Sequence, residues 1–262
     1  ERGEDVLYFS MSSGISGTCH AARIAAEELL EEFPERTVRV VDSLGSGFGT
    51  GLMACKAADL RAAGKSAAET ADIMDADAQN TLQFFTVDDL NFLKRTGRVS
   101  GATAMKMEKD CRFFLLQPVF SNSTPGRVQL WVDLMRFHYP FRARWGKKRR
   151  TLFTFQGAHS ILKEKHRPEG AFLSGGSDMP FAIFVDGSSN LPGRLLRELT
   201  IEILPCSYTM NGQPSTYDGS LDSFDAHEYY DMLRQGGRVQ TSLLNTQLFL
   251  DSFRPVLERG ED

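Results

Sequence analysis

Short apolar runs alternate with segments of helical spacing in the first part of the chain. Residues 6–11 form a mostly apolar run that predicts a buried strand, and residues 19–32 carry alanine and leucine at helical spacing with glutamates outside. A second strand is predicted over residues 37–41. A glycine-rich loop at 45–51 then leads into a helix that ends near Ala63.

The same alternation returns in the last part of the chain. Residues 181–186 are apolar and predict a buried strand, followed by a short helix at 193–199 and a strand at 201–205. Helices are predicted over 225–235, where an aspartate begins the helix and glycines follow it, and over 246–258. Strands that alternate with helices predict an α/β fold with a largely parallel sheet.

The middle of the chain differs in charge from the rest. Residues 104–180 hold 14 Lys/Arg and 6 Asp/Glu, a balance of +8, against −12 for the remainder. Residues 128–134 alternate like a strand, and residues 142–150 are a basic run. The segment also contains Trp131 and Trp145. A nucleic-acid contact and a solvated or partner-facing surface both fit this pattern, and we expect the second.

Composition is that of a soluble globular protein. With 262 residues, 41% hydrophobic and 24% charged, the chain can form one large domain or two modest ones. It contains no apolar run long enough to span a bilayer, and its acidic first residues do not resemble a secretory signal. The scattered cysteines predict buried thiols in a reducing cytoplasm. They are Cys19, Cys55, Cys111 and Cys206.

The two ends of the chain carry the same five residues. The sequence ERGED occupies positions 1–5 and again 258–262, so the last predicted helix ends where the first strand begins. We infer a circularly permuted order, with both ends in one exposed turn. Residues 1–80 and 181–262 are then expected to form one discontinuous domain, and residues 81–180 a second, divergent one.

Two hydroxyl-rich loops precede predicted helices. They are residues 12–18, SSGISGT, and residues 241–245, TSLLN. A helix N-terminus offers free N–H groups and about half a positive charge, so such loops suit a carboxylate or a phosphate. Neither contains a lysine, so the anion need not be highly charged. Serine and threonine before a helix also serve simply as caps, as we predict for Ser66.

Other catalytic motifs fail on inspection. Residues 45–50 miss the last glycine of the dinucleotide fingerprint, and no GxxxxGK[ST] loop occurs. Ser16 is not in a GxSxG elbow because position 18 is threonine. Asp88 and Asp89 are expected to start a helix rather than form an acid/base pair. The histidines show no metal-ligand spacing. They are His20, His138, His159, His166 and His227.

The motifs together resemble the DegV family. That family carries "DSS..LP", "TSQP", "SSGLSGT", "DS" with a glycine-rich tail, and "vddL.yL.k.GRis". The corresponding segments are VDGSSNLP (185–192), TSLLN (241–245), SSGISGT (12–18), VDSLGSGFGTG (41–51) and FTVDDLNFLKRTGRVSGA (85–102). Starting at residue 181 and continuing from residue 6 after the end, they follow the family's order.

The resemblance implies two α/β domains with a fatty acid between them. The acid's carboxylate would meet hydroxyls of the two loops, here Thr241 and Ser242 with Ser12 and Ser13, while Gly14 assists by its shape. No metal and no cofactor other than the bound long-chain acid is expected.

The resemblance also implies a partner. In bacterial fatty acid kinases a DegV-like subunit holds the acid while a separate kinase subunit phosphorylates its carboxylate. Arg144, in a basic segment, and His159, in GAHS, are the candidates to serve the phosphate. The family's second domain is preserved only in fragments over residues 104–180.

Three functional hypotheses follow. The leading one is a cytoplasmic fatty-acid carrier that is not itself an enzyme and that presents the acid to a kinase. The first alternative is a small-molecule kinase or hydrolase that uses the same anion site. The second is a nucleic-acid-binding protein that uses the basic segment 104–180, although we expect neither nucleic acid nor a membrane span.

Overall fold

The computed structural model describes the two sequence-predicted α/β segments almost completely. It describes residues 4–81, 84–86, 113–115, 138–139, 153–155, 181–217, 222 and 224–259. The chain divides into two compact units, residues 1–118 with 178–262, and residues 119–177. The second unit contributes the short strands β5 (His138–Tyr139) and β6 (Phe153–Phe155), which pair antiparallel.

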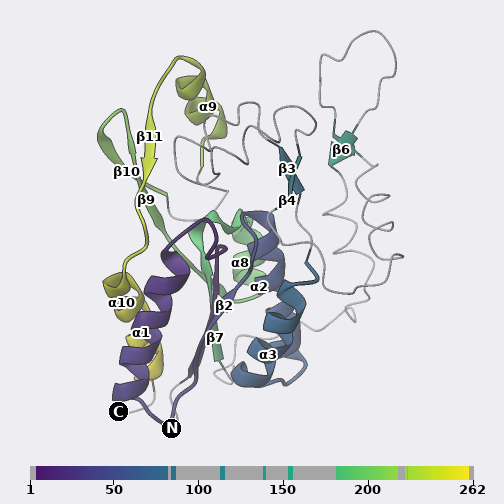
Figure 1. The fold of residues 1–262 in the computed structure, drawn as a ribbon, viewed down its shortest axis with the longest axis vertical. Coiled ribbons are helices and arrows are strands. Elements are labelled where there is room, and N and C mark those ends of the chain that lie inside the picture. Colours follow the sequence, from purple (N-terminus) through teal and green to yellow (C-terminus); the bar gives the residue numbers. More distant parts are fainter. Residues whose placement is uncertain are drawn as a thin grey trace. The chain divides into compact units, whose positions relative to one another are not determined.

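A four-stranded parallel sheet forms the centre of the first unit, in the order β2-β1-β7-β8. Its strands are β1 (Asp5–Ser10), β2 (Val38–Asp42), β7 (Phe181–Asp186) and β8 (Ile201–Leu204). Strands β1 and β7 pair directly, so the two ends of the sequence build one sheet (Figure 1). The predicted α/β class with a largely parallel sheet is therefore confirmed.

Two helices, α1 (Thr18–Glu32) and α10 (Thr246–Leu257), cover one face of this sheet and pack on each other (Figure 1). The core below them is aromatic. The ring centroids of Tyr8 and Phe249 are 5.0 Å apart, and those of Phe184 and Phe253 are also 5.0 Å apart. All four side chains are almost fully buried.

The opposite face carries α2 (Phe48–Ala62), α3 (Ala67–Ala78) and α8 (Gly193–Glu198). Alanine and methionine side chains from α2 and α3 pack on the residues that β1 and β7 point to this side. Successive side chains along each strand point to opposite faces of the sheet and therefore pack into two separate cores, one on each face, as expected for a central parallel sheet.

A small antiparallel sheet, which the sequence pattern did not predict, follows β8. It comprises β9 (Cys206–Met210), β10 (Gln213–Tyr217) and β11 (Val239–Thr241), with β9 in the middle. Helix α9 (Ala226–Arg234) lies between β10 and β11 in the sequence, and Asp225 caps it as predicted. A further antiparallel pair joins β3 (Phe84–Thr86) to β4 (Phe113–Leu115).

The first strand and the last helix lie side by side. The amide of Glu4 donates to the carbonyl of Val256 over 3.3 Å, and Arg259 forms an ion pair of 3.6 Å with Glu4. This proximity suits the permuted order inferred from the repeated ends, which stays a prediction, as does the domain boundary near residue 80. The helix expected from Asp88 and the strand expected at 128–134 lie outside the described residues.

Candidate functional site

The loops that leave the parallel sheet gather at its carboxyl edge, because all four strands run the same way. The connection from β1 through α1 leads to β2 on one side, and that from β7 through the 3-10 turn η1 (Gly187–Ser189) and α8 leads to β8 on the other. Helices α1 and α8 pack on opposite faces. The order of the sheet therefore reverses between β1 and β7, the place where open α/β sheets bind their ligands.

The loop after β1 is held by hydrogen bonds within itself and to the loop after β2. The amide of Ser12 donates to the carbonyl of Gly45 over 2.8 Å, and the buried Ser12 Oγ accepts from the amide of Gly14 over 3.2 Å. The carbonyl of Ser12 accepts the amides of Ile15 and Ser16, both over 3.1 Å. These amides are therefore already committed, and Ser12 serves first to shape the loop.

A carboxylate lies directly beside this loop. Asp42, at the end of β2, accepts the amide of Ser13 over 3.2 and 3.3 Å and the amide of Leu44 over 3.0 Å. The sequence pattern singled out Asp42 only as a strand end. Its charge matters, because residues 10–17 and 241–247 contain no lysine or arginine to balance it.

The first turn of α1 begins at this loop. Gly17 is the N-cap and offers no side chain for capping. The Oγ of Ser16 accepts the amide of Thr18 over 3.2 Å and lies 2.9 Å from the Thr18 hydroxyl. Ser16 thus takes the local capping role, which leaves the exposed hydroxyl of Ser13 as the loop's outward-facing donor.

The second predicted loop is the end of a strand followed by a cap. Thr241 is the last residue of β11, and the amide of Ser242 donates to the carbonyl of Ser207 over 2.8 Å. Asn245 caps α10 by accepting the amide of Leu248 over 2.9 Å. The hydroxyl-bearing side chains of Thr241 and Ser242 are exposed, so the capping role falls to Asn245 and not to them.

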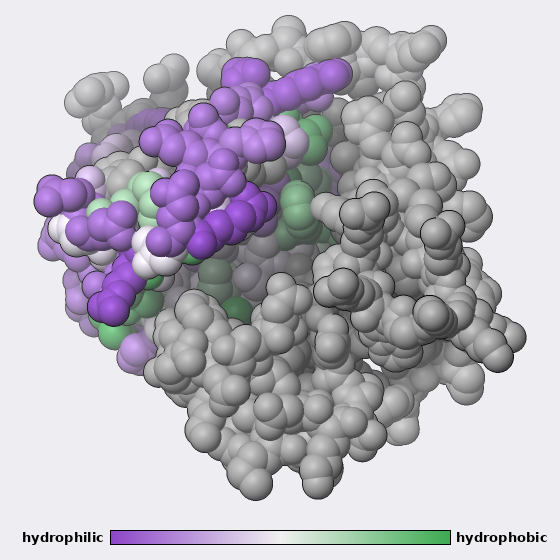
Figure 2. All heavy atoms as spheres, turned by 90° about the horizontal axis from the view of Figure 1, so that it is seen from above, coloured by the Kyte–Doolittle hydropathy of each residue, from purple (hydrophilic) through white to green (hydrophobic). Residues whose placement is uncertain are grey.

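The two loops lie close together at one point. A Cβ placed on Gly17 would lie 3.6 Å from Cδ2 and 3.7 Å from Cδ1 of Leu243. Leu243 is nevertheless 55% exposed. Seen from above, the described surface is mostly hydrophilic, with a few hydrophobic atoms lying deeper than the hydrophilic atoms beside them (Figure 2). The loop that carries Ser13 therefore lies next to the loop that carries Thr241, and the exposed Leu243 side chain lies close to Gly17.

A buried polar cluster lies under the same edge, on the α10 side of the sheet. The Asp186 carboxylate accepts the amide of Ser188 over 2.8 Å, the Tyr8 hydroxyl over 3.4 Å and the Cys206 thiol over 3.9 Å. Burial and then Asp186 raise the pKa of Cys206 to about 12, and the same two causes raise the pKa of Tyr8 well above its ordinary value. The thiol is therefore protonated at neutral pH and unsuited to act as a nucleophile.

The residues predicted to serve a phosphate or a partner are not among those that the structure describes. Arg144 and His159 lie outside the described residues, as does most of the basic segment 104–180. Among the described residues, no three His, Cys, Asp or Glu side chains cluster as metal ligands would. None of the described helices is long and apolar enough to cross a membrane.

Taken together, the open parallel sheet and the hydroxyl-bearing loops at its reversal point define an α/β protein with a candidate anion site at the carboxyl edge. Comparison with protein families is specific for the first part of the chain. Residues 1–107 match the family described as "Uncharacterised protein, DegV family". The match covers the first 107 of the 262 residues and includes the loop at 12–18.

Curated DegV domain-containing proteins match the chain over a similar number of residues. DegV domain-containing proteins of Lactococcus lactis and Clostridium perfringens are 41% and 38% identical over 102 and 104 residues, or 39% and 40% of this chain. One from Deinococcus radiodurans is 37% identical over 105 residues, or 40% of this chain. The matches span only 35%, 36% and 36% of these relatives, so the chain corresponds to about a third of their length.

Among solved structures, a DegV family protein from Eubacterium eligens loaded with heptadecanoic acid is similar to part of the chain. The identity is 30% and the TM-score 0.36, over 40% of this chain and 39% of that one.

Proposed function

We propose that this protein binds a long-chain fatty acid, whose carboxylate accepts hydrogen bonds from Ser13 and Thr241, and that it carries the acid without reacting it. Ser12, Gly14 and Ser242 would shape or complete the same site. The observation that carries the proposal is the closeness of Leu243 to Gly17, which brings the two hydroxyl-bearing loops next to each other.

The charges around the loops favour a monoanion. Asp42 already occupies the amide of Ser13, and no lysine or arginine stands in either loop. A phosphate dianion would be repelled by Asp42 more strongly than a carboxylate. A carboxylate can instead be satisfied by neutral hydroxyl donors, which avoids the cost of leaving it desolvated and unpaired.

The tail would provide most of the affinity. Each buried CH₂ contributes about 0.8 kcal/mol, so a long chain outweighs the two hydroxyl contacts. The hydroxyls would then fix the orientation of the head group. The match of residues 1–107 to the DegV family supports this ligand class, because the motifs that resemble the fatty-acid-binding family include the loop at 12–18.

The decisive measurement is a titration of palmitate, below its micelle concentration, against the wild type and the double variant Ser13→Ala with Thr241→Ala. Hydrogen bonds to a charged group are worth roughly 1.5–3 kcal/mol each, so we expect a loss of about 100-fold or more in affinity. The fold should persist, because both side chains are exposed.

A matched control removes two hydroxyls that bond to helix carbonyls, Thr81→Ala with Ser252→Ala. This variant should bind as the wild type does. Equal affinity in the wild type and the Ser13/Thr241 variant would remove the proposed site. A wild type that binds no acid at all would remove the function.

The finer roles are also proposals. Presentation of the acid to a kinase subunit, with Arg144 and His159 at the phosphate, follows from the family resemblance alone. A cytoplasmic location fits the reduced thiols of Cys19, Cys55 and Cys206. Formation of ADP and an acyl phosphate from ATP and palmitate by the lone chain would contradict the carrier role and favour a small-molecule kinase.

A further inference from the structure

Leu243 is far more exposed to solvent than Leu244, the next residue in the chain. Leu244 is 4% exposed and belongs to the core under α1 and α10, whereas Leu243 is 55% exposed. Leu244 therefore anchors the loop, and Leu243 projects from a fixed backbone. An exposed leucine alone needs no explanation, but this one belongs to one hydroxyl-bearing loop and lies close to the other.

The position of Leu243 relative to the hydroxyl groups of the two loops decides which part of a ligand it can contact. It follows Thr241 by two residues and lies close to Gly17, the N-cap of α1. The carbon atoms next to a carboxylate held by both loops would pass within van der Waals reach of its methyl groups. A small inorganic anion in the same place would leave those methyl groups in water.

We infer that Leu243 contacts the first methylenes of the bound acid and so sets the preference of the site for carboxylates that carry a hydrocarbon chain. The inference rests on the proposed fatty-acid function and adds to it a specificity-determining residue. Two expected properties distinguish a direct contact between Leu243 and the acid from a general effect of the substitution on the fold. The contact must depend on apolar character, and it must affect short and long chains alike.

The test compares decanoate and palmitate, by titration, on the wild type, Leu243→Ser and Leu243→Met. About half of the leucine surface is available for burial, which predicts a loss of roughly fivefold to tenfold for Leu243→Ser with both acids. Leu243→Met keeps an apolar side chain of similar size and should stay within about twofold. Ile73→Ser, at a 37% exposed position on α3, is the matched control and should bind as the wild type does.

Each outcome decides a separate point. Binding by the wild type with no change in Leu243→Ser would overturn the inference and leave the proposed function intact. A loss seen only with palmitate would place Leu243 at the far end of the chain and also overturn it. Equal losses in the Met and Ser variants would show that hydrophobicity is not the cause. No binding by the wild type would overturn the proposed function, and this inference with it.

Discussion

Arg61 holds together two parts of the first unit that are far apart in the sequence, and its replacement should be costly. It lies in the last turn of α2, only 5% exposed. Its Nη1 donates to the carbonyl of Phe181 over 2.9 Å, and its Nη2 to those of Leu199 and Thr200 over 2.6 and 3.0 Å. Burial lowers the pKa of this guanidinium, and the charge of Glu4 acts in the opposite direction.

The magnitude follows from the balance of two opposing terms. Arg61→Met retains an apolar stem but leaves three carbonyls without their donors, at about 1–3 kcal/mol for each one that stays buried. Removal of a partly desolvated charge offsets some of this cost. We estimate a net loss of about 3 kcal/mol in the free energy of unfolding, or about 10 °C in melting temperature for a unit of this size.

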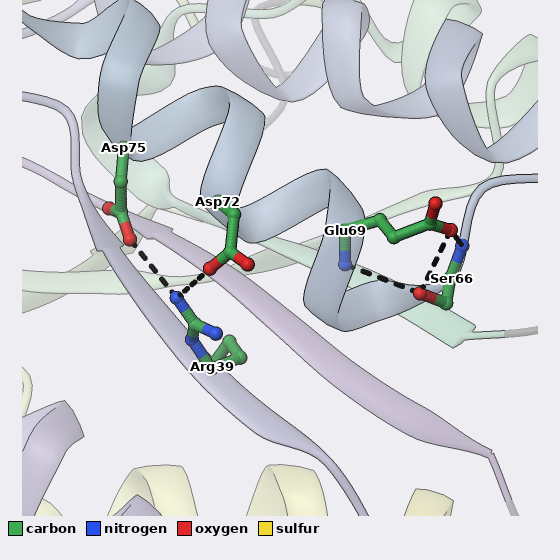
Figure 3. A network of polar contacts seen from close by, with 5 residues as sticks. All are labelled: Arg39, Ser66, Glu69, Asp72 and Asp75. Carbon is green, nitrogen blue, oxygen red and sulfur yellow. Dashed lines mark hydrogen bonds and ion pairs between the residues drawn. The ribbon is translucent and has the colours of Figure 1, made fainter.

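The control is Arg39, which forms two ion pairs and is more exposed to solvent than Arg61. Nη2 of Arg39 lies 2.9 Å from Asp72 and 3.2 Å from Asp75 on α3, with 35% of its side chain exposed (Figure 3). Exposed pairs contribute about 0–1 kcal/mol, so Arg39→Met should cost less than 1 kcal/mol. Urea unfolding followed by circular dichroism measures both. If Arg39→Met costs as much as Arg61→Met, the argument from burial is wrong.

Two further predictions concern the buried polar cluster and α2. Because burial holds the folded-state pKa of Cys206 at about 12 against an ordinary 9.0, its contribution to stability is complete below pH 9 and disappears as the pH rises from 9 to 12. Denaturant titrations across that range should show a shallower decline for Cys206→Ala than for the wild type. Gly51→Ala should destabilise the protein by about 1–3 kcal/mol, since the new Cβ would lie 2.7 Å from the carbonyl oxygen of Ser189, although alanine is the better helix former. A raised melting temperature in Gly51→Ala would contradict this.

Local signals predicted the helices well because their causes are local. Ser66 caps α3 as expected, and the structure adds the reciprocal bond from Glu69, three residues later, which completes a capping box (Figure 3). The helix predicted over residues 19–32 runs from Thr18 to Glu32. Both elements are specified by spacing and caps within a few residues, so distant contacts do not change their limits.

The antiparallel sheet was missed although a signal for it exists. Asn211 and Gly212 both have positive φ, 50° and 81°, the conformation that a two-residue hairpin turn requires. An Asn-Gly pair between two strand-length segments is a strong hairpin signal, and it separates β9 from β10. In β9, Cys206, Tyr208 and Met210 alternate with Ser207 and Thr209 but are only partly buried, and the run is too short for its pattern alone to predict a strand. As a result Thr241 was assigned to a loop, whereas it ends β11.

The candidate site is the part that sequence reasoning could define only by residue type. Local patterns and the family resemblance both selected the two hydroxyl-bearing loops, but neither could say which donors remain available. The fold decides this, because β2 pairs with β1 and so brings Asp42 against the amide of Ser13, while the carbonyl of Ser12 takes the amides that follow. A cup of helix amides would favour any anion, including phosphate. A pair of hydroxyl-bearing loops beside a fixed carboxylate favours a weakly charged head group, and the exposed Leu243 favours one with a hydrocarbon chain attached.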